Sequence, residues 1–148
     1  MKRRWPRRIG AVISIAVVDS GPLLAVANRA DPDHERCLRV LEQPTLRWVV
    51  PALCVAEVSY LLGRRAGPAV EAAFLGSLVD VDVRSPAGRD WLRIAELVDR
   101  FADFPLGGTD ASVAVLAERL ETDLVITLDR RHFAALESKT GRRFRLLP

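Results

Sequence analysis

Short apolar segments that alternate with helical segments restrict this chain to a parallel α/β fold. Residues 11–18 form a run rich in β-branched residues, and residues 123–129 contain a second apolar run. Runs of this length and composition are typical of strands that are buried on both faces. Segments with helical periodicity separate such runs, and this alternation predicts a parallel sheet with helices on both faces. Ligands of these sheets bind beyond the carboxyl ends of the strands, so we expect a functional site there.

The expected elements follow from hydrophobic periodicity and from the positions of proline and glycine. We expect strands at residues 11–18, 48–50, 79–83, 123–129 and 144–147, and helices at residues 23–28, 31–43, 53–65, 69–78, 89–101, 110–120 and 132–137. The clearest amphipathic helix is the one at 89–101, whose apolar stripe consists of Trp91, Ile94, Ala95, Val98, Phe101 and Ala102. We interpret this stripe as core or as a dimer surface.

The composition is that of a globular protein that needs no covalent support. Of the 148 residues, 49% are hydrophobic and 28% are charged, and this length predicts one domain. The two cysteines, Cys37 and Cys54, form no pattern with histidine that is typical of zinc sites. A structural zinc site and a disulfide framework are therefore both disfavoured.

A basic segment precedes the first apolar run. Residues 1–8 hold five basic residues and no acid; because the whole chain carries a net charge of +3, the remainder carries −2. We divide the chain into a basic extension at 1–11, which could attract phosphate backbones or have no function, and a single domain at 12–148. A secretory signal is disfavoured because Asp19 interrupts the apolar run, which is also too short to span a bilayer. We therefore expect a cytoplasmic protein that does not associate with membranes.

Four acidic residues stand where a globular protein rarely places charge. Asp19 and Asp129 each follow a buried strand, at the edge where ligands bind. Glu57 and Asp110 have apolar neighbours about one turn away, so we expect both on buried helix faces. Unpaired carboxylates are costly in such places, and four in one cleft indicate a divalent cation. An all-oxygen ligand set suits Mg²⁺ or Mn²⁺.

Each acid also has an ordinary explanation. Asp19 and Asp129 could belong to turns or caps after strands, and Asp110 could favour a helix N-terminus through the helix dipole. Glu57 could pair with an arginine two turns further along its helix. A shared metal site explains all four acids at once and predicts hydrolysis of a phosphodiester. The spacing of the acids leaves the nucleic acid open.

Four motifs, in order along the chain, resemble those of the PIN-domain ribonucleases and in particular the VapC toxins of bacterial toxin–antitoxin pairs. The motifs are VVDSGPLL at residues 17–24, VAEV at 55–58, DFPLGGTDA at 103–111 and TLDRRHF at 127–133. The resemblance runs from about residue 17 to the C-terminus and does not include the basic extension. It implies a three-layer α/β/α sandwich around a mainly parallel sheet, with an acidic pocket that binds Mg²⁺ or Mn²⁺.

The same resemblance implies roles for individual residues. The residues that match the family's acidic quartet, which binds the metal and catalyses RNA cleavage, are Asp19, Glu57, Asp110 and Asp129. Ser20 and Thr109, each next to one of these acids, are weaker candidates for supporting roles. The family also implies an RNA substrate, a VapB-type antitoxin that blocks the site, and a homodimer.

Basic side chains near the proposed acids are candidates for contacts with RNA phosphates. These are Arg64, Arg65, Arg130 and Arg131, because guanidinium groups bind phosphate oxygens in a bidentate manner. A general bias of the composition towards arginine explains them equally well. For His34 and His132 we expect surface or packing roles, although His132 could approach a phosphate from the loop after Asp129.

The leading hypothesis is a Mg²⁺- or Mn²⁺-dependent endoribonuclease that acts as the toxin of a toxin–antitoxin system. The alternative is a catalytically silent PIN-like module that binds RNA or protein. A phosphatase acting on small molecules is disfavoured, because the sequence has no glycine-rich loop of the kind that binds phosphates.

Overall fold

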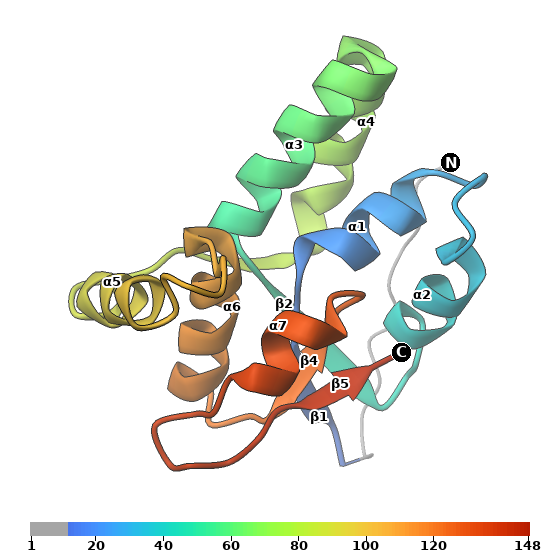
Figure 1. Ribbon diagram of the computed structural model, residues 1–148. Helices are drawn as coiled ribbons and strands as arrows, with labels where there is room; N and C mark the ends of the chain where they lie inside the picture. Colours follow the sequence, from blue (N-terminus) through green and yellow to red (C-terminus); the bar gives the residue numbers. More distant parts are fainter. Residues whose placement is uncertain (1–11) are drawn as a thin grey trace.

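A five-stranded sheet, parallel throughout, forms the centre of the protein (Figure 1). The computed structural model describes residues 12–148, and the expected basic extension at 1–11 lies outside the described residues. The strand order is β3-β2-β1-β4-β5, with bounds β1 Ser14–Val18, β2 Leu46–Pro51, β3 Asp82–Arg84, β4 Leu124–Ile126 and β5 Arg145–Leu147. The parallel sheet predicted from the alternating segments is therefore confirmed.

Helices cover both faces of the sheet. Their bounds are α1 Ser20–Ala27, α2 His34–Leu41, α3 Ala52–Ala66, α4 Pro68–Ser77, α5 Asp90–Arg100, α6 Gly108–Arg119 and α7 Arg130–Ala135, with a 3₁₀ turn at Leu78–Asp80. In Figure 1, α1 and α2 lie on one side of the sheet and α5 and α6 on the other, while the α3–α4 hairpin extends beyond it. The chain runs from β1 to β3 in one direction along the sheet and from β3 to β5 in the other, so right-handed crossovers place the two sets of helices on opposite faces. This arrangement is the α/β/α sandwich that the sequence predicts.

The core lies between the central strands and α6. The last three residues of β1 and the last two of β4 are fully buried. Helix α6 is buried all round over residues 111–117, because it packs against β1, β2, α3 and α5. A helix that is apolar on every side must be enclosed in this way. The strand that precedes Asp19 and the helix that carries Asp110 thus belong to the buried core.

Helix α1 begins at Ser20, three residues before the predicted start at residue 23. The cause is Asp19, whose carboxylate accepts a hydrogen bond from the Ser20 backbone N–H at 2.7 Å and so caps the helix. Pro22 has no backbone N–H. It fits in the first turn because the N–H groups there have no acceptor within the helix. The chain therefore turns into a helix directly at the end of β1.

The predicted apolar stripe of α5 is only partly buried. Ile94 is buried, but Trp91 is 51% exposed and Val98 is also exposed. The helix instead turns Arg93 and Leu97 inward. The interpretation of Trp91 as a core residue is therefore wrong, and its interpretation as part of a dimer surface stays a prediction.

Both cysteines and His34 lie in the interior of the protein. Cys37 and Cys54 are buried and free, as the sequence indicated. His34 packs between α1 and α2 with its Nδ1 2.9 Å from the Ala25 carbonyl oxygen, which confirms a packing role. No helix within residues 12–148 has the length and apolar character that crossing a membrane requires.

Candidate functional site

Asp19 directly follows β1, at the point where the strand order of the sheet reverses. Strand β1 pairs with β2 on one side and with β4 on the other. The Asp19 backbone N–H donates to the Ile126 carbonyl oxygen at 2.9 Å, which ties it to the end of β4. The residue is only 5% exposed. The first acid therefore lies where open α/β sheets bind their ligands.

Thr127, immediately after β4, connects two of the acids. Its hydroxyl donates to Asp19 Oδ2 at 2.8 Å and accepts from the Asp129 backbone N–H at 2.9 Å. Thr127 is fully buried, so both hydrogen bonds are shielded from water. No sequence pattern pointed to a role for this residue. Its position as a polar residue inside an otherwise apolar run, 124–128, is the signal that could have found it.

Asp19 experiences the negative charge of its neighbours. Burial raises the pKa of Asp19 to about 6, and the charges of Asp110 and Glu57 act in the same direction. The hydrogen bonds from Thr127 and Ser20 oppose the shift. These three carboxylates come from the end of β1, from α3 and from α6, so the fold brings distant acids to one site.

Asp110 and Asp129 face each other across an imidazole. His132 Nδ1 lies 2.6 Å from Asp129 Oδ2 and 3.5 Å from Asp110 Oδ2. Burial raises the pKa of Asp110; the charge of His132 opposes this shift, and those of Asp129 and Glu57 add to it. The structure thus brings the second histidine, which we expected on the surface or in packing, into contact with two of the four acids.

Glu57 is exposed, and the expectation that it lies on a buried helix face is wrong. The buried stripe of α3 consists of Cys54, Val58 and Leu62, four residues apart. Because successive helical residues rotate by about 100°, Glu57 lies on the flank of that stripe. Among residues 12–148 it forms no ion pair, so the predicted alternative of an arginine partner is also absent. Its charge acts on Asp19 and Asp110 instead.

Three of the acids lie at helix N-termini. Asp19 caps α1, and Asp129 caps α7 by accepting from the His132 backbone N–H at 3.1 Å. Asp110 lies in the first turn of α6. The ordinary explanations therefore hold beside the functional one, because helix N-termini stabilise each carboxylate singly. Capping does not explain why three helices begin at one place.

The chemistry of the donors fits Mg²⁺ or Mn²⁺. The site offers carboxylate oxygens and no thiolate, because burial keeps the pKa of the nearby Cys54 thiol raised. The buried hydroxyl of Ser20 has no hydrogen-bond partner within residues 12–148 beyond a weak interaction with that thiol. The acids are spaced more widely than the ligands of a bound metal ion. Within residues 12–148, no group of three or more His, Cys, Asp or Glu side chains is arranged as a set of metal ligands. Glu57 and Asp129 are the more exposed of the four acids.

The other predicted residues lie at different distances from the acids. Thr109 is half-buried in the first turn of α6, where its carbonyl oxygen accepts from Ser112 Oγ at 2.6 Å. Arg64 and Arg65 end α3, roughly 10 Å of helix beyond Glu57. The structure therefore brings Thr109 next to the acids and places these two arginines on the hairpin.

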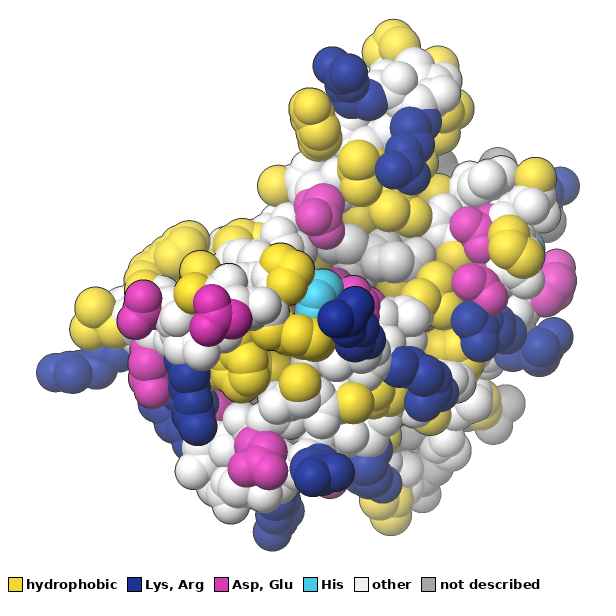
Figure 2. Space-filling model, viewed as in Figure 1, with side chains coloured by type: hydrophobic (Ala, Val, Ile, Leu, Met, Phe, Trp, Pro, Cys, Tyr) yellow, Lys and Arg dark blue, Asp and Glu magenta, His cyan; other side chains and the backbone are white. Residues whose placement is uncertain are grey.

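The two arginines after Asp129 differ from each other. Arg130 donates to the carbonyl oxygen of Pro148 and so anchors the C-terminus. Arg131 is exposed, and its guanidinium lies 5.1 Å from the centre of the Phe104 ring. In Figure 2, a histidine lies beside acidic and basic side chains at the centre of the face shown, with hydrophobic side chains around it.

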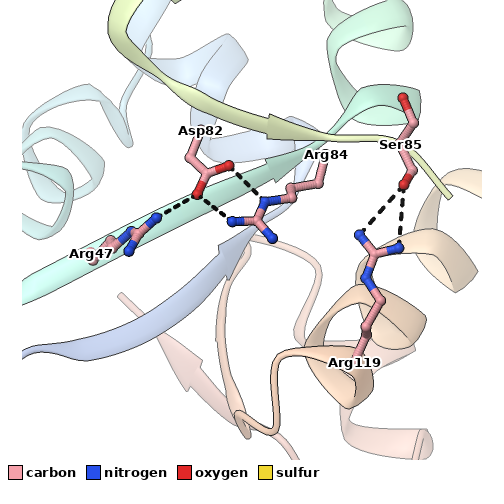
Figure 3. Close-up of polar contacts among 5 residues, drawn as sticks. All are labelled: Arg47, Asp82, Arg84, Ser85 and Arg119. Carbon is pink, nitrogen blue, oxygen red and sulfur yellow. Dashed lines mark hydrogen bonds and ion pairs between the residues drawn. The ribbon is translucent and has the colours of Figure 1, made fainter. Parts of the chain in front are cut away.

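Several acids elsewhere in residues 12–148 have arginine partners. At the edge of the sheet, Asp82 accepts hydrogen bonds from Arg47 at 2.8 Å and from Arg84 at 2.8 and 3.1 Å (Figure 3). Arg119 reaches the Ser85 carbonyl oxygen nearby at 3.4 Å. The hydrogen bonds with Arg84 and Arg47 lower the pKa of Asp82. The Asp82 carboxylate is neutralised by these arginines and needs no ligand to explain it.

Sequence comparisons identify relatives over most of the chain. The PIN domain family matches residues 16–139. Ribonuclease VapC26 of Mycobacterium tuberculosis is 34% identical over 134 residues, which cover 89% of this chain and 99% of that protein.

Solved structures with the same fold have lower sequence identity. VapC20 of M. tuberculosis, a toxin that cleaves the sarcin-ricin loop, superposes with a TM-score of 0.68 at 18% identity, over 74% of this chain and 86% of that one. VapBC2 of Rickettsia felis, bound to a DNA fragment from its promoter, gives a TM-score of 0.65 at 14% identity, over 90% and 97%. A toxin–antitoxin complex of Klebsiella pneumoniae gives 0.62 at 17% identity, over 82% and 92%.

Proposed function

This chain belongs to the PIN domain family, and from this premise we propose that it is a metal-dependent endoribonuclease acting as the toxin of a toxin–antitoxin pair. Within the family it belongs to the VapC-type ribonucleases, which confirms the resemblance of its four motifs. The observation that supports the proposed chemistry is the convergence of carboxylates from distant elements on a buried Asp19. We propose further that the protein meets its RNA in the cytoplasm.

Mg²⁺ or Mn²⁺ would be held by Asp19, Asp110 and Asp129, with Glu57 as the outermost ligand. When bound, such an ion lowers the pKa of a water molecule and neutralises charge on the phosphodiester. Thr127 keeps the Asp19 carboxylate oriented through its 2.8 Å hydrogen bond. The N-termini of α1, α6 and α7 present partial positive charge, which favours phosphate oxygens at the same place.

We propose a VapB-type antitoxin and a second copy of this chain as protein partners. The related folds from R. felis and K. pneumoniae are themselves described as toxin–antitoxin complexes. Among residues 12–148, large apolar side chains are exposed on the α3–α4 hairpin, at Tyr60 and Leu75, and on α5, at Trp91 and Leu92. Helix α4 buries none of its side chains fully, so this hairpin has apolar surface that a partner can cover.

The alternative function is a catalytically silent module that binds RNA or protein. The observation that favours it is the looser spacing of the acids, which form no ready set of metal ligands within residues 12–148. The two functions predict different responses to metal and chelator.

The deciding experiment incubates the protein with a mixed RNA pool in Mg²⁺, in Mn²⁺ and in EDTA. We expect cleavage that requires metal and that Asp19→Asn abolishes. The matched control is Asp123→Asn, which removes an acid that is paired with Arg145 near the start of β4, away from the site. RNA that is retained without any metal-dependent cleavage would support the binding module. Equal cleavage by wild type and Asp19→Asn would contradict the assignment of the acids.

A further inference from the structure

Phe104 lies at the surface beside the acidic site, in the turn between α5 and α6. Its backbone N–H donates to the Phe101 carbonyl oxygen at 2.9 Å, which fixes the turn. Leu106, two residues further on, is buried and fills the core position of this segment. Phe104 itself remains half-buried at the surface rather than enclosed in the core.

Arg131 holds a free positive charge next to this ring. Its guanidinium lies 5.1 Å from the Phe104 ring centre, a distance typical of a cation–π contact. Within residues 12–148 it forms neither an ion pair nor a hydrogen bond, whereas Arg47, Arg93 and Arg145 all pair with acids. Arg131 is therefore positioned by an aromatic ring rather than neutralised by a carboxylate.

His132 connects the aromatic ring to the acids. The Phe104 and His132 rings meet edge to face, with centres 5.1 Å apart and planes at 89°. The same imidazole contacts Asp129 and Asp110 through Nδ1. Phe104 is thus one imidazole ring away from two of the carboxylates.

We propose that Phe104 and Arg131 form a stacking subsite for a nucleobase of single-stranded RNA, adjacent to the phosphodiester that is cleaved. This inference rests on the proposed function. Aromatic rings and guanidinium planes stack on unpaired bases, and a guanidinium also binds phosphate. The carboxylates repel the RNA backbone wherever a cation does not neutralise them. A contact with the base holds the strand without adding to that repulsion.

The test compares the binding of two short single-stranded RNAs to Asp19→Asn protein, in which cleavage is suppressed. One RNA has mixed bases, and its counterpart is abasic and keeps only ribose and phosphate. We expect the base-bearing RNA to bind about tenfold more tightly in Mg²⁺, measured by fluorescence anisotropy. Phe104→Leu, which keeps the apolar bulk but removes the aromatic face, reduces this ratio to about one. It leaves binding of the abasic RNA unchanged.

Further variants separate stacking from folding. Phe104→Trp preserves the ratio, and Arg131→Lys lowers it while keeping the affinity for the abasic RNA, because lysine keeps the charge but not the plane. Arg143→Ala is the matched control: it removes an exposed arginine from the loop that precedes β5. We expect it to leave the ratio unchanged.

Defined outcomes would overturn the subsite. A full base preference in Phe104→Leu, or no base preference in the Asp19→Asn protein, contradicts it. Cleavage by the wild type without any base preference means that the subsite fails and the proposed function stands. If the protein shows a base preference that depends on Phe104 but never cleaves RNA, the subsite stands and the proposed function fails.

Discussion

Two regions of this protein place charge at low exposure, and they do so in opposite ways. Between α5 and α6, the Arg93 and Glu118 side chains are 10% and 9% exposed and meet at 3.0 Å. The Lys139 backbone N–H also donates to Glu118. At the end of β1, Asp19 is equally buried, but the charged groups that act on it are other acids. Opposite charges stabilise each other within the fold, whereas like charges accumulate only where something outside the chain neutralises them.

The direction of the pKa shifts separates the two kinds of region. The pKa is lowered for Asp82 and Asp123, which hydrogen-bond to arginines. It is raised for Asp19 and Asp110, where burial dominates and neighbouring acids add to it. An acid held in its less stable charged form, at the switch point of a parallel sheet, indicates a functional site rather than a structural one.

The largest effect should come from removing an acid of the like-charged region. We expect Asp19→Asn and Asp110→Asn to lower the initial rate of RNA cleavage in Mg²⁺ by at least about a hundredfold, because the loss of even an outer-shell partner costs 10- to 100-fold. The folded state should survive, since asparagine also caps helices. Asp82→Asn, which removes the neutralised carboxylate, should retain the wild-type rate. A wild-type rate in Asp19→Asn would remove the distinction between the regions.

The complementary region should show the opposite pattern. Arg93→Met leaves Glu118 buried without its partner, and we expect it to lower the free energy of unfolding by about 3 kcal/mol. Urea denaturation measures this loss, and cleavage at low temperature should persist. Adding Glu118→Leu should restore most of the stability, because two apolar side chains can replace a buried pair. An unchanged urea midpoint in Arg93→Met would mean that the pair is not a stabilising unit.

Stability as a function of pH sharpens the same contrast. The folded protein holds the Asp19 proton more tightly than the unfolded chain, whose pKa is near 3.8, because burial raises the folded pKa to about 6. The destabilisation by Asp19 therefore develops as the pH rises from 3.8 through about 6, and it reaches about 3 kcal/mol above that range. In EDTA, the stability of Asp19→Asn relative to wild type should rise over this window and then level off. A constant difference across pH would contradict the raised pKa.

The smallest effect should come from Thr127, which supports Asp19 from within the core. Thr127→Val removes the hydroxyl that donates to Asp19 and accepts from the Asp129 backbone. We expect a loss of about 1.5 kcal/mol in the free energy of unfolding and slower cleavage, because two buried polar groups lose their partner. Thr127→Ser keeps the hydroxyl and should behave nearly as wild type in both measurements. Equal losses in the two variants would point to packing instead.

Local sequence patterns predicted the elements and the position of two acids along them. The apolar runs that end at Asp19 and near Asp129 are buried strands, and both acids follow the carboxyl ends of those strands. Periodicity and capping act over a few residues, so they can be read without knowing the packing. Some element ends differ, as at α1, which begins at Ser20. The larger errors lie in orientation: Glu57 is exposed rather than buried, and α5 turns Arg93 inward in place of Trp91.

Contacts between distant segments could be known only once the chain was folded. The position of His132 between Asp110 and Asp129, and the contact of Phe104 with Arg131, depend on how α6, α7 and the turn before α6 pack together. The link that Thr127 makes to Asp19 depends on the pairing of β4 with β1. Residue types restrict which contacts are chemically useful, but they leave the rotation of each helix free. Side-chain packing in the core sets that rotation, and with it the geometry of the site.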